Sequence, residues 1–371
     1  MRSESDDGLV TDLLLRNPSS VWARPGLTLL GWGVEHRIDP GAGPDRFDKA
    51  LRQLRATGSP MALASFTFDE ERSGSVLIVP EVLIRVDEKG AEPLIGDWGG
   101  LPGHGPIEPG NRGRLSPPDL NAWTSSAEAA LRAIAGSEVE KVVLSRVVEA
   151  RFATEVHPLP VLESLLATEP GSHTYLVDSL IGSSPELLVS LESSRVSSLS
   201  LAGSAPSGQG GGALSTAKMA TEHRLAADSV EDALAPHCTH LDRSKSTVAR
   251  FGEIQHLATR FDGLAHPGTV ITDLLATLHP TAAVAGTPTK SAIELIREIE
   301  THQRGRYTGP IGWLDREGDG EFAIALRCGL IEGAAVTLYA GAGLVTGSDA
   351  GRELEETDMK LVPMLRALGI S

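Results

Sequence analysis

The interpretation of this chain starts from the stretch TLYAGAGLVTGSDAGRELEETDMKL, Thr337 to Leu361. Its first residues favour an extended backbone, and Gly341 and Gly343 then follow two positions apart. Because glycine has no Cβ atom, these positions permit positive φ angles or a close approach of the backbone to a ligand. Beyond Gly351 the composition becomes helical. We therefore expect a strand, a glycine-lined segment and a helix.

Acidic and basic residues share one face of this predicted helix. Glu353, Glu356 and Lys360 are spaced at i, i+3 and i+7. Two carboxylates and an ammonium group beside a glycine-lined floor could hold a hard cation together with an anionic ligand. There is also an ordinary explanation, because acids favour a helix N-terminus and Glu356 with Lys360 forms a common i, i+4 pair. Spacing alone leaves both interpretations open.

Composition narrows the class of protein. Hydrophobic residues make up 41% of the 371 residues and aromatic residues only 4%, so the core must be mainly aliphatic. The net charge of −16 argues against nucleic acid and anionic membranes as partners. The two cysteines, Cys238 and Cys328, make no disulfide framework. With no signal-peptide pattern and no apolar run of the ~20 residues that a membrane span needs, we expect a cytoplasmic protein.

Strands in runs with helices between them predict an α+β fold. Helices are expected at 45–56, 122–136, 161–168, 215–235, 270–278 and 290–302. The segments GPIGWLD, EFAIALRCGLI and AVTLYAGAG are expected to form an antiparallel meander. SHTYLVDSLIGSSPELLVSL should contain two strands that are interrupted at 182–185. Surface loops are expected at 99–118 and in the glycine-rich run 208–213.

Two residues at predicted strand ends could carry proton transfer. Lys141 opens the apolar segment KVVLSR, and burial there would favour a neutral amine that can act as a base. Composition alone favours the alternative, a lysine that reaches solvent. Glu186 follows Pro185, and in an apolar pocket its carboxyl would stay protonated and could donate a proton. The commoner alternative is a solvated carboxylate.

Two further residues could bind ions. Glu222 lies inside the helix predicted for 215–235, where it could face Glu356 across a site and complete a Mg²⁺ clamp. A surface pair with Lys218, four residues earlier, is supported equally well by the spacing. Arg327 lies in a predicted strand with apolar neighbours. If its side chain points inward it needs an anion, and a carboxylate is the natural partner.

Several segments together resemble the chorismate-utilising enzymes, in particular the isochorismate synthase branch. They follow the family's order between residues 141 and 361, and it is their combination that makes the signal specific. The matching segments are KVVLSR (141–146), SPELL (184–188), LAGSA (201–205), K-x-x-x-EHRL (218–225), HLAT (256–259), LHPTAAVAGTPT (278–289), GPIGWLD (309–315), IALRCGL (324–330), YAGAGLV (339–345) and ELEETDMKL (353–361).

The resemblance implies an α+β fold in which two large antiparallel sheets pack together and helices lie outside. Residues 1–371 would form a single domain, and residues 1–120 would be its less constrained N-terminal part. It also implies an isomerase that converts chorismate to isochorismate with Mg²⁺ as cofactor. In that reaction water adds at C2, the C4 hydroxyl leaves, and the double bonds shift.

The resemblance also assigns roles to residues. Lys141 would be the base that activates water, and Glu186 the acid that protonates the departing hydroxyl. Glu222 and Glu356 would bind Mg²⁺, and Glu353 would hold a metal-bound water. The implied substrate-binding residues are Arg327 and Lys360 at carboxylates, the backbone NH groups of Gly203, Gly341 and Gly343, and the small apolar pair Ala283 and Val284.

The sequence leaves alternatives open. A salicylate synthase, which eliminates pyruvate from isochorismate, resembles this chain at every catalytic position, but it tends to place a threonine near Ala283 and Val284. Anthranilate-type synthases do not normally carry a lysine at the position of Lys141. A non-catalytic binder of small carboxylates, or a nicotinamide-dependent oxidoreductase suggested only by AGAG, would belong to other classes; the latter lacks its βαβ context. We expect a monomer that acts on chorismate for siderophore or menaquinone biosynthesis.

Overall fold

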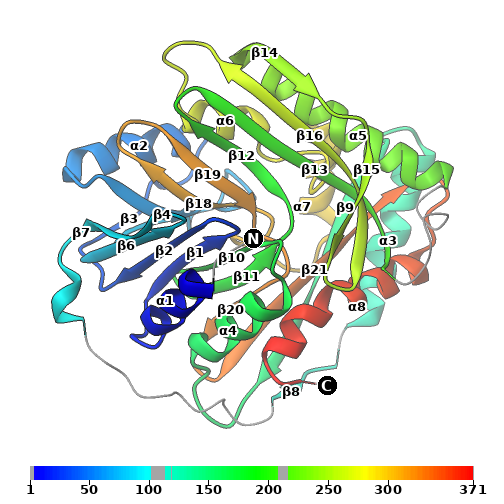
Figure 1. Ribbon diagram of the computed structural model, residues 1–371. Coiled ribbons are helices and arrows are strands. Elements are labelled where there is room, and N and C mark those ends of the chain that lie inside the picture. Colours follow the sequence, from blue (N-terminus) through cyan, green and yellow to red (C-terminus); the bar gives the residue numbers. More distant parts are fainter. Residues whose placement is uncertain (1–3, 102–112, 118, 208–215, 371) are drawn as a thin grey trace.

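The computed structural model describes residues 4–101, 113–117, 119–207 and 216–370, and its strands form two large antiparallel sheets (Figure 1). One sheet has eleven strands, and a short strand, β8 (Arg114–Leu115), pairs with β9 at its side. The order across this sheet is β17 (Gly286–Thr287), β9 (Lys141–Arg151), β21 (Ala335–Val345), β20 (Cys328–Glu332), β11 (Leu180–Ser184), β10 (His173–Val177), β1 (Ser20–Arg24), β2 (Leu27–Trp32), β6 (Val82–Asp87) and β7 (Gly90–Ile95).

The other sheet has ten strands, and β15 (Thr247–Phe251) pairs with β16 at its side. The order across it is β14 (Cys238–Arg243), β16 (Ile254–Ala265), β13 (Arg195–Pro206), β12 (Leu187–Glu192), β19 (Gly320–Ile324), β18 (Pro310–Asp315), β4 (Met61–Ser65), β5 (Val76–Val79) and β3 (His36–Ile38). One apolar cluster contains Trp22, Leu29 and Tyr175 from the first sheet with Leu63 and Ile311 from the second. The two sheets therefore pack against each other, as expected.

Eight α-helices of the described residues cover the outer faces of the sheets. They are α1 (Glu4–Leu14), α2 (Arg46–Thr57), α3 (Leu120–Ala135), α4 (Pro158–Thr168), α5 (Ala217–Leu234), α6 (Ile271–Leu278), α7 (Thr289–Ile299) and α8 (Ala350–Ala367). Helices α1, α4 and α8 lie together on one side of the eleven-stranded sheet (Figure 1), where their apolar residues share a cluster with its strands. The six predicted helices are confirmed as α2 to α7, whereas the sequence analysis missed α1.

The predicted meander at the C-terminal end is wrong. Strands β18 and β19 pair in the ten-stranded sheet, while β20 and β21 pair in the eleven-stranded sheet. The segment EFAIALRCGLI therefore contains two strands, and the chain crosses between the sheets at Arg327. The same happens in SHTYLVDSLIGSSPELLVSL, which forms three strands rather than two and crosses at Pro185 and Glu186. A run of apolar residues does not show to which sheet each half belongs.

The two predicted surface loops and the stretch Thr337 to Leu361 can also be compared with the structure. The run 208–213 and most of 99–118 lie outside the described residues, although β8 lies inside the second of them. In the quoted stretch, AGAG belongs to β21 rather than following it. Helix α8 begins as expected, because the Asp349 side chain accepts a hydrogen bond from the Arg352 backbone N–H at 3.0 Å.

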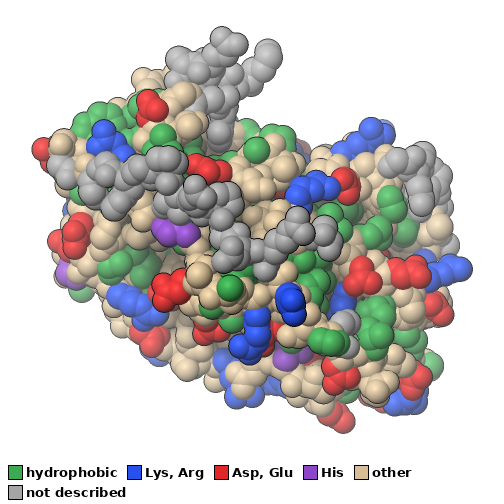
Figure 2. Space-filling model, turned by 90° about the horizontal axis from the view of Figure 1, so that it is seen from below, with side chains coloured by type: hydrophobic (Ala, Val, Ile, Leu, Met, Phe, Trp, Pro, Cys, Tyr) green, Lys and Arg blue, Asp and Glu red, His purple; other side chains and the backbone are tan. Residues whose placement is uncertain are grey.

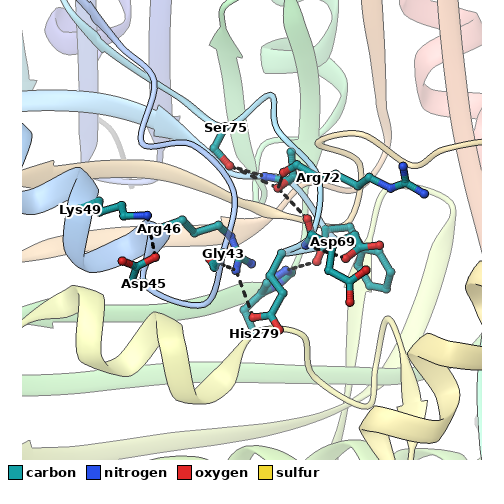
Figure 3. A network of polar contacts seen from close by, with 12 residues as sticks. Gly43, Asp45, Arg46, Lys49, Asp69, Arg72, Ser75 and His279 are labelled. Carbon is teal, nitrogen blue, oxygen red and sulfur yellow. Dashed lines mark hydrogen bonds and ion pairs between the residues drawn. The ribbon is translucent and has the colours of Figure 1, made fainter.

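A polar network holds the loop after β4 against the segment that starts at His279. The Nε2–H of His279 donates to the Phe68 carbonyl at 2.9 Å, and Figure 3 shows His279 beside the loop that carries Asp69. Burial and the nearby charge of Arg46 lower the pKa of His279 to about 3, so this histidine stays neutral. Arg297 of α7 binds Asp69 at 2.5 and 2.8 Å. The network fixes the start of the segment that contains Ala283 and Val284.

The surface carries charges of both signs. Figure 2 shows basic and acidic side chains interspersed over the face that it presents, although the whole chain has a net charge of −16. Within the described ranges, none of the helices combines the length and the apolar character that crossing a membrane requires.

Candidate active site

A cavity lies where β9 and β21 of one sheet approach β13 of the other, and α5 and α8 contribute to its wall. It contains about 560 Å³ of empty space, part of which is open to solvent. Three predicted site residues, Lys141, Glu353 and Glu356, are outside the lining but close to it. The nine that line it are Glu186, Gly203, Glu222, Ala283, Val284, Arg327, Gly341, Gly343 and Lys360.

Lys141 is the first residue of β9, and its side chain is fully buried (0% exposed). The interpretation as a lysine that reaches solvent is therefore wrong. β9 is an interior strand at this point, because Lys141 pairs with Val345 of β21 on one side and with Thr287 of β17 on the other. The Nζ atom lies 3.5 Å from Glu222 Oε1. This places an amine directly behind the cavity wall.

Glu186 lies in the short crossing between β11 and β12 and is 5% exposed. Burial raises the pKa of its carboxyl to about 7, although a hydrogen bond from the Leu201 backbone N–H (3.2 Å) and the charges of Lys141 and Arg327 oppose the shift. Near neutral pH a large fraction of this group is protonated. The carboxyl can therefore donate a proton into the cavity that it lines.

Arg327 does not lie in a strand as predicted. It occupies the crossing between β19 and β20 with a φ angle of +49°. This left-handed conformation is uncommon for a residue with a side chain, and it turns the chain from one sheet to the other. Arg327 lines the cavity and interacts electrostatically with Glu186 and Glu356. A cation on this wall suits a carboxylate ligand.

The expected surface pair of Lys218 with Glu222 is absent. Lys218 of α5 instead makes an ion pair with Glu353 of α8, whose side chain is only 2% exposed. Burial and the neighbouring charge of Glu356 raise the pKa of Glu353, against the effect of Lys218. Because Lys218 pairs with Glu353 on the other helix, Glu222 makes no ion pair with Lys218 and faces Lys141 instead.

Glu356 and Lys360 form the i, i+4 pair that the spacing suggested, with 2.7 Å between Nζ and Oε1. The pair is more than a surface contact, because Lys360 also donates to the Gly341 carbonyl at 2.8 Å and lines the cavity. Burial of Glu356 opposes ionisation, but the charge and hydrogen bond of Lys360, with Lys218 and Ser204, outweigh it and lower the pKa. Glu356 is therefore a carboxylate at neutral pH.

The three carboxylates considered for Mg²⁺ do not converge on one point. Among the residues described, no three His, Cys, Asp or Glu side chains are grouped closely enough to hold a metal ion. Each of these glutamates has a lysine partner, which supplies the positive charge; the pairs are Glu222 with Lys141, Glu353 with Lys218 and Glu356 with Lys360. Their oxygen atoms still suit Mg²⁺ chemically.

The glycines of AGAG are required by close approach rather than by positive φ. Both belong to the extended strand β21, opposite Ser145 and Val143 of β9. A Cβ atom at Gly343 would lie 2.3 Å from the Oε1 of Glu222, and one at Gly341 would lie 2.7 Å from a backbone carbonyl. Gly203 differs, because it has a φ of +71° at an irregularity in β13. The missing side chain at Gly343 leaves room for the carboxylate of Glu222.

Sequence reasoning missed several polar residues of the cavity, among them Tyr307, Ser204 and His256. Tyr307 lines it and stacks on Tyr339, with 5.1 Å between the ring centroids. Ser204 and His256 also line it, and 3.2 Å separates the Ser204 Oγ from the His256 Nδ1. Ser204 and His256 lie inside the segments LAGSA and HLAT, which carried the resemblance but received no chemical role. Nothing in the local sequence singled out Tyr307.

Comparison with known proteins identifies the family. The family described as chorismate binding enzyme matches residues 108–369. Isochorismate synthase DhbC of Bacillus subtilis is 33% identical over 381 residues, which covers 94% of this chain and 93% of that protein. Isochorismate synthase MenF of Bacillus subtilis is 36% identical over 264 residues, but the match spans only 56% of its length and 68% of this chain.

A solved structure agrees with these matches. The putative 2,3-dihydroxybenzoate-specific isochorismate synthase DhbC from Bacillus anthracis superposes with a TM-score of 0.84 and 29% identity, covering 98% of this chain and 100% of that one. The two packed antiparallel sheets are thus the chorismate-utilising fold, as the resemblance implied. A family match over 108–369 and relatives that follow nearly the whole chain lead to one conclusion: this chain belongs to the chorismate-binding enzymes.

Proposed function

We propose that this protein is an isochorismate synthase, which converts chorismate to isochorismate. The observation that carries the proposal is that Glu186, a carboxyl with a pKa of about 7, lines the cavity, and that the fully buried amine of Lys141 lies 3.5 Å from Glu222 of the same wall. An amine that takes a proton and a carboxyl that gives one are the two groups that this reaction requires. Similarity to named isochorismate synthases supports the assignment.

The proposed reaction moves protons between water, Lys141, Glu186 and the substrate. In the proposed step the Lys141 ammonium group first loses a proton, and the resulting amine then takes a proton from a water molecule whose oxygen bonds to C2. The ring double bonds shift and the C4–O bond breaks. Glu186 gives its proton to the departing hydroxyl, which leaves as water. One water enters and one leaves, so the reaction is an isomerisation.

Two cationic side chains are proposed to bind the carboxylates of chorismate. Arg327 and Lys360 both line the cavity, and Arg327 has the fork geometry that suits a carboxylate. The backbone N–H groups at Gly203, Gly341 and Gly343 are further proposed donors. This supports an anionic substrate even though the protein as a whole is strongly acidic.

We further propose Mg²⁺ as the cofactor. Glu222 and Glu356 would hold it, with Glu353 holding a metal-bound water. When bound, the ion would neutralise and orient the ring carboxylate of chorismate. The support is chemical: Glu222 of α5 lines the cavity, Glu353 and Glu356 lie on α8, whose Lys360 also lines it, and each carboxylate now has a lysine as its counter-charge.

The test is chromatography of purified protein with chorismate, first with Mg²⁺ and then with EDTA. Isochorismate that forms only with Mg²⁺ is the expected result. Salicylate with pyruvate, formed faster than spontaneous breakdown, would instead identify a salicylate synthase and contradict the argument from Ala283 and Val284. Binding of chorismate without turnover would identify a non-catalytic binder. The pathway that uses the product, a siderophore or menaquinone pathway, stays a prediction, as do the monomeric state and the cytoplasmic location.

The Mg²⁺ site has its own test in Glu356→Gln, which removes one of the two proposed ligand charges. The Mg²⁺ concentration needed for half-maximal turnover should rise at least about tenfold. Lys49→Ala, which removes an exposed lysine that pairs with Asp45, is the control and should leave the Mg²⁺ titration unchanged. An unchanged titration in Glu356→Gln would remove that residue from the metal site.

A further inference from the structure

His256 is a buried side chain of the cavity to which the proposed chemistry gives no task. It lies in β16, opposite Ser204 of β13, and is 5% exposed. It lines the catalytic cavity together with Glu186 and Arg327, and it also borders a neighbouring cavity. Its Nε2 atom is buried and has no hydrogen-bond partner among the described residues. Buried ring nitrogens are usually paired, so this one calls for an explanation.

The hydrogen bonds around the ring determine which nitrogen carries the proton. Nδ1 lies 3.2 Å from the Ser204 Oγ, and the ring also bonds to the backbone of Gly203. The bond to Gly203 runs to its backbone carbonyl, which can only accept, and Nε2 makes no bond. Nδ1 therefore carries the proton.

The ring is also neutral. Burial lowers the pKa of His256 well below its ordinary value, and the positive charges of Arg327 and Lys360 act in the same direction. A neutral imidazole with its proton on Nδ1 has a bare lone pair on Nε2. A residue that lines the cavity therefore carries an unpaired hydrogen-bond acceptor, and the contact of Nδ1 with Ser204 helps to hold the orientation of the ring.

We propose that His256 Nε2 accepts a hydrogen bond from the ring hydroxyl of the substrate and so positions that hydroxyl for Glu186. This inference rests on the proposed function. Both carboxylates of chorismate are ionised at neutral pH and cannot donate, and the attacking water belongs to Lys141. The C4 hydroxyl is the remaining donor. As Glu186 protonates its oxygen, the hydrogen already on that oxygen becomes more acidic, so the bond to Nε2 strengthens in the transition state.

The test compares chorismate with its analogue that has hydrogen in place of the C4 hydroxyl. Binding is measured by calorimetry in the Lys141→Ala background, where the substrate is not consumed. The parent should bind chorismate about tenfold more tightly than the analogue, as one hydrogen bond provides. His256→Asn keeps a donor near the Nδ1 position but has no acceptor near Nε2, so the ratio should fall to about one. His256→Gln places an amide oxygen near Nε2 and should keep most of the discrimination.

His223→Asn is the matched control. His223 is equally buried, at 5% exposed, but lines a different cavity and should keep the tenfold ratio. With Lys141 present, His256→Asn should raise KM by up to about tenfold and also lower kcat by about 10 to 100-fold, because the bond forms on binding and strengthens in the transition state. The inference is overturned if His256→Asn still binds chorismate tenfold more tightly than the analogue. It is also overturned if His256→Gln loses this preference as completely as His256→Asn does. If the protein binds chorismate with this discrimination but never converts it, only the proposed function fails.

Discussion

At the scale of single residues, environment decides the chemistry of the site. Glu186 is an ordinary glutamate in sequence, and the acid role proposed for it depends on burial, which raises the pKa of its carboxyl to about 7. Lys141 begins a strand, where lysines usually reach solvent, yet its side chain is enclosed and faces Glu222. Neither environment follows from neighbours in sequence. Each of these two residues therefore allows a direct prediction.

The first prediction concerns pH. Glu186 acts as an acid only when protonated, so kcat/KM should fall tenfold per pH unit above the pKa of about 7 and level off below it. The direction follows from the shift: burial raises the pKa of this carboxyl, so the protonated form persists to neutral pH and is lost as pH rises. The measurement is the rate of isochorismate formation from pH 5.5 to 9.

Glu186→Gln provides the control for that profile. It should reduce kcat by about 10² to 10⁴-fold, and the remaining activity should not show the fall above neutral pH. A wild-type profile that stays flat across neutral pH, or a Glu186→Gln profile that keeps the same fall, would contradict the acid role.

The second prediction concerns Lys141. Lys141→Ala should lower turnover by at least about 10² to 10⁴-fold, because the base that activates water is removed. The fold should persist, since strand β9 keeps its pairing with β21. Turnover is measured by chromatography and folding by circular dichroism. Lys49→Ala serves as the control and should keep full activity; wild-type turnover in Lys141→Ala would disprove the base assignment.

At the scale of elements, the crossings between the two sheets place the reacting groups. Glu186 lies where the chain passes from β11 to β12, and Arg327 lies where it passes from β19 to β20. A residue at such a crossing is not committed to the face of a strand, so its side chain can point into the space between elements. The glycines of β21 complete the arrangement, because they let α5 place Glu222 against the strand.

The third prediction tests this close approach. A Cβ atom in Gly343→Ala would lie 2.3 Å from the Oε1 of Glu222 and 3.2 Å from the Cε of Lys141, so the ion pair must shift. Activity should fall by about 10² or more, since displacements of about 1 Å at reacting groups have costs of that size. The measurement is kcat/KM together with the unfolding temperature.

Gly171→Ala is the matched control for Gly343→Ala. Its added Cβ would meet only the Phe251 ring at 3.9 Å, an ordinary van der Waals distance, so activity should stay within about twofold of wild type. If Gly343→Ala were as active as Gly171→Ala, the packing of Glu222 against β21 would have no part in catalysis.

At the scale of the whole molecule, the two sheets and their helices bring residues from distant segments to one cavity. Lys141, Glu222 and Gly343 are far apart in sequence but meet where β9, α5 and β21 lie together. That residues 1–371 form a single domain stays a prediction, supported by the pairing of β1 with β10 and of β4 with β18. Lysine side chains also balance the negative charges of Glu222, Glu353 and Glu356 without a metal ion.

The fourth prediction follows from this balance of charge. Because lysines already neutralise Glu222, Glu353 and Glu356, the protein should stay folded in EDTA, and Mg²⁺ alone should raise the unfolding temperature by less than about 2 °C. Mg²⁺ together with chorismate should raise it by several degrees, since the substrate carboxylate completes the site. Thermal scans with chorismate use Glu186→Gln, which slows turnover and keeps the Lys141–Glu222 pair. This account would be contradicted if the protein unfolded in EDTA, or if Mg²⁺ alone raised the unfolding temperature as much as Mg²⁺ together with chorismate.

The sequence by itself determined which helices form and which residues are available for chemistry. It predicted α2 to α8, two packed antiparallel sheets through the resemblance, and half of the residues that line the cavity. Helices could be predicted because apolar spacing and capping are local properties of the backbone. The segments that resemble the family supplied the candidates for the acid, the base and the carboxylates, and their roles stay predictions.

Only the tertiary structure decided how those residues behave. It showed that Lys141 is enclosed, that Lys218 binds Glu353 rather than Glu222, and that Arg327 lies at a crossing between sheets. It also showed that the buried Nε2 atom of His256 has no hydrogen-bond partner among the described residues. The physical reason is that burial, desolvation and ion pairing depend on groups brought together from distant parts of the chain, and the spacing of neighbouring residues does not encode them.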